Sequence, residues 1–127
     1  MFLFREFSSK ALLLILLSFS VQASDMDFLV KTTPVQRASV QTSFMTEKLR
    51  LDAQTQKKVA AVNQKYADLI EPVLHNDDSS FSKMMDIRSL QGQKDAELET
   101  ILSKEQFATY EDSRDELKSY MEQRLGH

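Results

Sequence analysis

Few side chains in this sequence are of types that do chemistry. The chain has no cysteine and two histidines, His75 and His127. His75 is close in sequence to Asp77 and Asp78, and these three side chains could hold a metal ion loosely. A zinc site needs three or four ligands, and the residues around His75 are typical of a polar loop. We therefore expect no metal site, and the absence of cysteine excludes disulfides and thiol catalysis.

Arrangements typical of an active site are also lacking. No serine lies in a nucleophile elbow, and no glycine-rich loop precedes a helix to hold a phosphate. The carboxylate pairs Asp77–Asp78 and Glu111–Asp112 are adjacent in sequence, and they lie in a loop or on a charged helix face. They lack the apolar surroundings that would tune a general acid. We expect a protein without enzyme activity and without a cofactor.

The first residues have the pattern of an export signal. Arg5 and Lys10 form a basic start, residues 11–21 are apolar, and residues 21–23 (Val-Gln-Ala) form a small-x-small cleavage site. The apolar run is shorter than the roughly 20 residues that span a bilayer. We expect a signal peptide over residues 1–23, cleavage after Ala23, an exported protein and no stable membrane insertion after cleavage.

The charge balance limits the partners of the chain. It carries 16 basic and 19 acidic residues, a net charge of −3 at pH 7. Nucleic-acid binding needs a basic face, so no nucleic-acid partner is expected.

The composition predicts an all-α fold. There are two glycines and two prolines, and Glu, Lys, Gln, Ala, Leu and Met, which favour helix, are abundant. Apolar residues recur at steps of three and four in four segments, which is the period of a helix. We expect a flexible arm over residues 24–32 and a single helical domain over residues 33–127. Its helices are predicted near residues 34–50, 53–74, 81–102 and 104–125.

Two of the predicted helices begin with the same pair of residue types. Ser103 and Gln106 can form a capping box, in which each side chain accepts a hydrogen bond from the backbone N–H of the other residue. Leu102 precedes this cap, and it can pack against Phe107 as a hydrophobic staple. Leu51 and Asp52 open the second helix in a similar way. The chain therefore reads as two helical hairpins.

Residues 101–106 (Ile-Leu-Ser-Lys-Glu-Gln) resemble the LTxxQ motif of the Spy/CpxP-like periplasmic proteins. Ser103 stands where the motif has threonine. The earlier copy, residues 51–55, keeps Leu51 and a capping Asp52, but it has Thr55 where the motif has glutamine. The resemblance implies a four-helix protomer of helical hairpins that pairs as a curved homodimer. It also implies an ATP-independent chaperone, or an accessory regulator of envelope-stress signalling.

An apolar, flexible group of side chains follows the polar loop at residues 75–79. Phe81, Met84 and Met85 begin the third predicted helix there. Methionine surfaces adapt to varied partners, and thin helices of this length cannot all bury their apolar stripes in a monomer. These three residues are the candidates for binding unfolded or misfolded envelope proteins. The alternative is that they belong to an ordinary core stripe.

Three functions remain open on the sequence. The first is a periplasmic holdase of the envelope stress response. The second is an accessory regulator that docks on the periplasmic sensor domain of a two-component system. The third is a weak metal-binding stress protein, which the scarcity of histidine disfavours.

Overall fold

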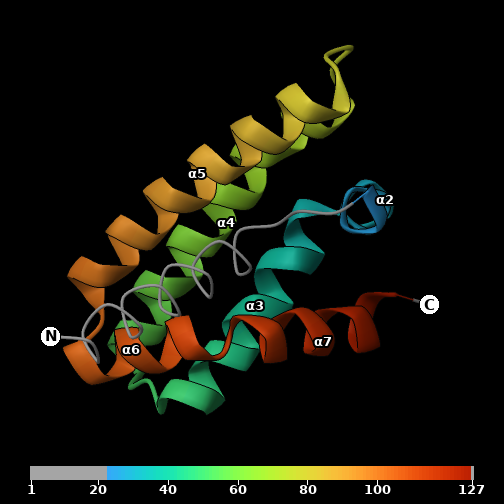
Figure 1. Ribbon diagram of the computed structural model, residues 1–127. Coiled ribbons are helices and arrows are strands. Elements are labelled where there is room, and N and C mark those ends of the chain that lie inside the picture. Colours follow the sequence, from blue (N-terminus) through green and yellow to red (C-terminus); the bar gives the residue numbers. More distant parts are fainter. Residues whose placement is uncertain (1–22, 127) are drawn as a thin grey trace, which may run out of the picture.

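The computed structural model describes residues 23–126, and this part of the chain is helical with no strand. Its helices are α2 (Ala23–Lys31), α3 (Pro34–Leu49), α4 (Ala53–His75), α5 (Ser80–Ile101), α6 (Lys104–Asp112) and α7 (Arg114–Leu125) (Figure 1). The predicted all-α class is confirmed. The predicted signal peptide, apart from Ala23, and His127 lie outside the described residues.

Short-range side-chain bonds set the starts of α3, α4, α5 and α6. Thr33 forms a capping box with Gln36 and is followed by Pro34 at the first helical position. Asp52 and Ser79 accept hydrogen bonds from the backbone N–H groups of Thr55 and Ser82, respectively. Each cap pairs one of the N–H groups that a helix start leaves without an intrahelical acceptor.

The core lies where α3, α4, α5 and α6 meet. Met45, Val59 and Leu98 are almost completely buried there. Tyr120 of α7 joins the core through its ring, which lies 5.3 Å from that of Phe44. The α4–α5 hairpin extends from this core past α6 and α7, and its tip lies at the top of Figure 1. Helix α5 packs mainly on α4, and its C-terminal end also meets α6.

Residues 24–32, which were expected to form a flexible arm, are helical over most of their length. Helix α2 occupies residues 23–31, and it packs against α4. Thr32 is buried, and Phe28 and Leu29 are partly buried. A buried arginine, described below, binds the C-terminal end of α2 and holds it in place. The sequence of residues 24–32 has no local feature that would do this.

The predicted helix over residues 104–125 is divided in two. It breaks at Ser113, which is buried and whose hydroxyl donates to the carbonyl of Thr109 at 2.6 Å. A serine that bonds back to the carbonyl four residues earlier often bends a helix. The break lets α6 contact both α3 and α5, while α7 packs along α3. Pro72, in contrast, does not stop α4, which continues to His75. Its ring is exposed, so water can reach the backbone where the proline removes a donor.

Candidate functional site

The tip of the α4–α5 hairpin is built by local polar bonds. Within the loop, the Asn76 side chain accepts from the backbone N–H of Asp78 at 3.0 Å. Ser79 caps α5, and the Lys83 ammonium donates to the carbonyl of Leu74 near the end of α4 at 3.1 Å. These bonds join the end of one helix to the start of the next, so the tip has a defined shape.

The predicted client-binding residues lie at this tip. Phe81 is 72 % exposed and Met85 is 46 % exposed, whereas Met84 is partly buried. Leu74 of α4 and Ile87 of α5 are buried just below the tip. The spacing explains the difference, because Phe81 and Met85 are four residues apart and share one side of α5. Ile87 is on another side, which faces the hairpin interior.

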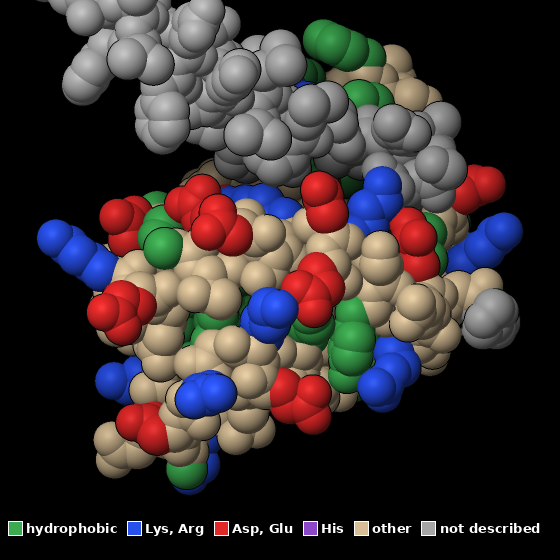
Figure 2. Space-filling view, turned by 60° about the horizontal axis from the view of Figure 1, so that its bottom comes forward, with side chains coloured by type: hydrophobic (Ala, Val, Ile, Leu, Met, Phe, Trp, Pro, Cys, Tyr) green, Lys and Arg blue, Asp and Glu red, His purple; other side chains and the backbone are tan. Residues whose placement is uncertain are grey.

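Figure 2 shows the side of the molecule that is at the bottom in Figure 1. On the described part of this face, acidic and basic side chains alternate, and apolar side chains appear in separate small patches. Mixed charge of this kind is typical of a solvated surface. This face therefore differs from the hairpin tip, where a large aromatic ring is mostly exposed.

The second LTxxQ-like segment forms the capping box that the sequence predicts. The Ser103 hydroxyl accepts from the N–H of Gln106, and the Gln106 side chain accepts from the N–H of Ser103, both at 3.1 Å. Gln106 also donates from Nε2 to the carbonyl of Leu49 at 3.3 Å. This bond joins the start of α6 to the end of α3, next to the earlier segment. Leu102 is buried in the core. The motif glutamine therefore has a tertiary contact in addition to its capping role.

The first segment makes only part of this arrangement. Asp52 accepts from the N–H of Thr55 at 2.8 Å, and this backbone hydrogen bond lowers the pKa of the Asp52 carboxyl. Thr55 stands in place of the motif glutamine, and no reciprocal bond closes a capping box here. Leu51 is partly buried against the core. The two segments therefore lie at the same end of the bundle, but only the second closes a capping box.

Variants of Ser103 and Leu102 should separate the contribution of local capping to stability from that of core packing. Ser103→Ala removes an acceptor for a helix-start N–H, and it should lower the free energy of unfolding by about 1 kcal/mol. Leu102→Ala leaves a cavity in the core, and it should lower the same quantity by about 2–4 kcal/mol. Urea unfolding measures both, and Ser119→Ala at an exposed position of α7 is the control. Equal, negligible losses for Ser103 and Leu102 would contradict the assigned start of α6.

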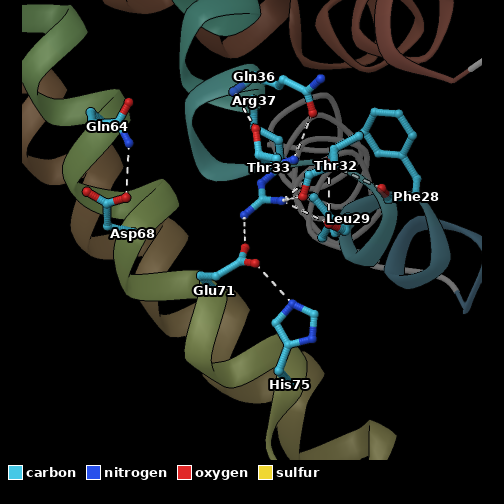
Figure 3. A network of polar contacts seen from close by, with 10 residues as sticks. All are labelled: Phe28, Leu29, Thr32, Thr33, Gln36, Arg37, Gln64, Asp68, Glu71 and His75. Atoms are coloured by element: carbon cyan, nitrogen blue, oxygen red, sulfur yellow. Dashed lines mark hydrogen bonds and ion pairs between the residues drawn. The ribbon is translucent and has the colours of Figure 1, made fainter.

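A buried arginine network, which the sequence analysis missed, fixes α2 (Figure 3). Arg37 is 2 % exposed, and its Nη1 donates to the carbonyls of Leu29 and Thr32 at 2.8 and 2.5 Å. Its Nη2 pairs with Glu71 Oε2 at 2.6 Å. The guanidinium therefore links the end of α2 to α4. Arg37 precedes the buried Phe44 by seven residues, which is two helical turns, so it lies in the apolar stripe of α3. A charged residue in such a stripe was the feature of the sequence that could have indicated its burial.

His75 takes part in this network and is not grouped with Asp77 and Asp78. Its Nε2 lies 3.0 Å from Glu71 Oε1, one turn earlier on α4. The hydrogen bond from Arg37, and then that with His75, lower the pKa of the Glu71 carboxyl. Within residues 23–126, no three His, Asp or Glu side chains come together in a way that could hold a metal ion.

A buried lysine bridges α5 and α3. Lys94 is 9 % exposed, and its Nζ donates to Gln41 Oε1 at 2.6 Å. Burial lowers the pKa of Lys94 to about 8. Lys94 lies between the buried Ile87 and Leu98 at steps of seven and four, so its position in the apolar stripe could have been noticed. Its amide partner is 53 residues away in sequence and gives no such signal.

Another cluster of polar side chains joins α5 to α6 and α7. The Tyr110 hydroxyl donates to Asp95 Oδ1 at 2.9 Å, and Arg114 pairs with Asp95 Oδ2 at 2.6 Å. Burial, together with the charge of Asp95, raises the pKa of the Tyr110 hydroxyl. The tyrosine therefore stays protonated and acts as a donor. This arrangement positions the three helices, because each of these polar side chains has a hydrogen-bond or ion-pair partner within the same cluster.

The comparison with known families bears on this geometry. Residues 27–110 match the family described as a domain of unknown function, DUF4890. The chain belongs to this family. The match to DUF4890 extends from α2 to the buried Tyr110 in α6, so it includes the Arg37 network, Lys94, the hairpin tip and the Ser103 cap. No curated protein and no solved structure matches the chain. None of the helices described in residues 23–126 combines the length and apolar character needed to cross a membrane.

Proposed function

We propose that this DUF4890 protein is an ATP-independent periplasmic chaperone of the envelope stress response, which holds unfolded or misfolded envelope proteins at the tip of its α4–α5 hairpin. The exposure of Phe81 at that tip carries the proposal. A phenylalanine that leaves most of its surface in water gives up stabilisation that burial would provide. Met85, four residues from Phe81 on the same side of α5, is 46 % exposed, and exposed apolar residues that lie together in this way can mark interaction sites.

The composition of the tip supports binding to varied segments. Met85 is next to Phe81 on the surface of α5, and Met84 lies partly exposed beside it. Unbranched thioether side chains adapt their shape to different partners. The resemblance of residues 101–106 to the LTxxQ motif and the predicted signal peptide support the same function.

The defined shape of the tip favours a second candidate, an accessory regulator that docks on the periplasmic sensor domain of a two-component system. The Ser79 cap and the bond from Lys83 to Leu74 order the tip without any client present. A pre-ordered surface binds one folded partner at low entropic cost. The adaptable methionine side chains at the tip favour the holdase, whereas the pre-ordered shape of the tip favours the regulator.

An aggregation assay tests the proposal. Purified protein lacking residues 1–23, at near-stoichiometric amounts, should slow the aggregation of a chemically unfolded client without ATP. The double variant Phe81→Ser/Met85→Ser should lose most of this protection while helicity and thermal stability change little, because both side chains are exposed. Val35→Ser, which removes a 64 % exposed apolar side chain at the start of α3, is the matched control and should keep full protection.

The outcomes separate the two candidates. Equal protection by the double variant and by the Val35 control would place the client surface elsewhere. If the unmodified protein protects no client at any ratio, the holdase proposal fails. Binding of the same unmodified protein to a folded sensor domain, lost in Phe81→Ser/Met85→Ser, would then establish the regulator.

A further inference from the structure

The apolar tip of the hairpin is bordered by exposed acidic side chains. Asp77 and Asp78 lie in the loop before α5, and Asp86 follows Met85 directly in sequence; all three are exposed. Among the described residues, none of these carboxylates takes part in an ion pair. Their side chains are therefore available to a partner that lies on Phe81 and Met85.

The basic side chains nearest the tip are less available. Lys83 is partly buried, and its ammonium donates to the Leu74 carbonyl. Arg88 is also partly buried, one turn below Met84 and Met85, and it has an interaction of its own. His75 is paired with Glu71. The three carboxylates are therefore exposed at the tip, whereas Lys83 and His75 bond to groups of the protein itself.

From this arrangement we infer that the hairpin tip selects cationic apolar segments, in which Lys or Arg side chains flank the apolar residues that contact Phe81 and Met85. This inference rests on the proposed function and adds the chemistry of the client. Complementary charge around an apolar contact speeds association and rejects like-charged partners. An apolar segment with acidic flanks would meet Asp77, Asp78 and Asp86 with repulsion.

Two synthetic peptides test this selectivity. They share one apolar sequence, and one carries lysines at its flanks where the other carries glutamates. Fluorescence anisotropy with protein lacking residues 1–23 should give a Kd for the lysine peptide about tenfold lower at low salt, because three exposed charge pairs each contribute modestly. The difference should shrink at 0.5 M salt, where the screening length falls to a few ångströms.

Matched variants locate the effect. The triple variant Asp77→Asn/Asp78→Asn/Asp86→Asn should remove the preference for the lysine peptide while helicity stays unchanged. The control Asp112→Asn/Asp115→Asn/Glu122→Gln neutralises three exposed acidic residues on α6 and α7, and it should keep the preference. The net charge changes equally in both variants, so a general charge effect would appear in both.

Several results would overturn the inference. Equal affinity for the two peptides would show that the tip does not select clients by charge, and so would loss of the preference in both triple variants. Either result leaves the holdase proposal intact if the aggregation assay succeeds. A dimer in solution that Phe81→Ser dissociates, together with no peptide binding, means that a second copy covers the tip. Absence of both peptide binding and client protection removes the proposed function as well.

Discussion

Replacing Glu71 by alanine should cost about 3 kcal/mol of folding free energy, because it leaves the charge of Arg37 buried without its partner. The Arg37 guanidinium is 2 % exposed, and its Nη2 lies 2.6 Å from Glu71 Oε2. Removing one member of a fully buried ion pair costs about 3–5 kcal/mol, and because the Glu71 side chain is 31 % exposed, the loss here should lie at the lower end of that range. Urea unfolding followed by circular dichroism measures the loss. Hydrogen exchange should show α2 opening more often, because Arg37 ties its carbonyl end to α4.

An exposed ion pair supplies the control for this experiment. Lys48 and Glu116 lie 2.8 Å apart, and both side chains are well exposed. Glu116→Ala should change the free energy of unfolding by no more than about 1 kcal/mol, as surface pairs do. If the Glu71 and Glu116 variants lose the same small amount, Arg37 is hydrated in solution and does not hold α2.

The Glu71 contribution should also depend on pH. The hydrogen bond from Arg37 lowers the pKa of Glu71 below its ordinary value of 4.5. A carboxyl whose pKa is lower in the folded state stabilises the fold above its unfolded pKa, and this stabilisation is lost as the pH falls through the folded pKa. The difference in stability between the unmodified protein and Glu71→Ala should therefore be full at pH 7 and should shrink below about pH 4.5.

Lys94→Met should raise the stability of the protein, by about 2–3 kcal/mol at pH 7. The pKa of Lys94 is about 8 in the fold and 10.5 in its ordinary state, which corresponds to a cost of about 3 kcal/mol for burying the ammonium. Methionine has a similar length and carries no charge. The variant loses the bond to Gln41, which offsets part of the gain.

The pH dependence distinguishes this cause from better packing. Because the pKa of Lys94 is lowered on folding, the unfolded chain binds more protons between pH 8 and pH 10.5, and stability from this group rises with pH over that range. The advantage of Lys94→Met should thus be largest below pH 8 and nearly absent above about pH 10. Lys57→Met, which replaces a lysine at an exposed position of α4, is the matched control. A pH-independent gain in Lys94→Met would show that packing, and not charge, is responsible.

Some errors of the sequence analysis share one physical origin. The prediction of a flexible arm over residues 24–32 rested on local features, and locally nothing holds α2. Its fixation comes from Arg37 and Glu71, and these two residues are 34 positions apart. The break at Ser113 is similar in part, because both α6 and α7 pack on α3 while α6 also contacts α5. The docking of α2 thus depends on a distant residue, whereas the break at Ser113 combines a local bond with packing between helices.

The candidate tip was partly predictable. The sequence placed Phe81, Met84 and Met85 after a polar loop at the start of a helix, and α5 does begin at Ser80. Periodicity alone could not rank their exposure, because a stripe of apolar residues continues down α5 to the buried Leu98. Whether a position in this stripe is covered depends on where the other helices pack against α5. Only the packed structure shows that α6 lies at the end of the hairpin opposite the tip (Figure 1).

The sequence by itself determined the all-α class, the starts of α3, α4, α5 and α6, and the Ser103–Gln106 cap. These features depend on side chains and backbone groups within one turn of each other, so their energetics are nearly complete in a short segment. The tertiary structure decided where α2 docks, which apolar residues stay exposed, and that Gln106 also bonds Leu49. It likewise decided the burial of Arg37 and Lys94. A charge can remain buried only where distant helices bring an acceptor to it, and that depends on packing among helices far apart in the chain.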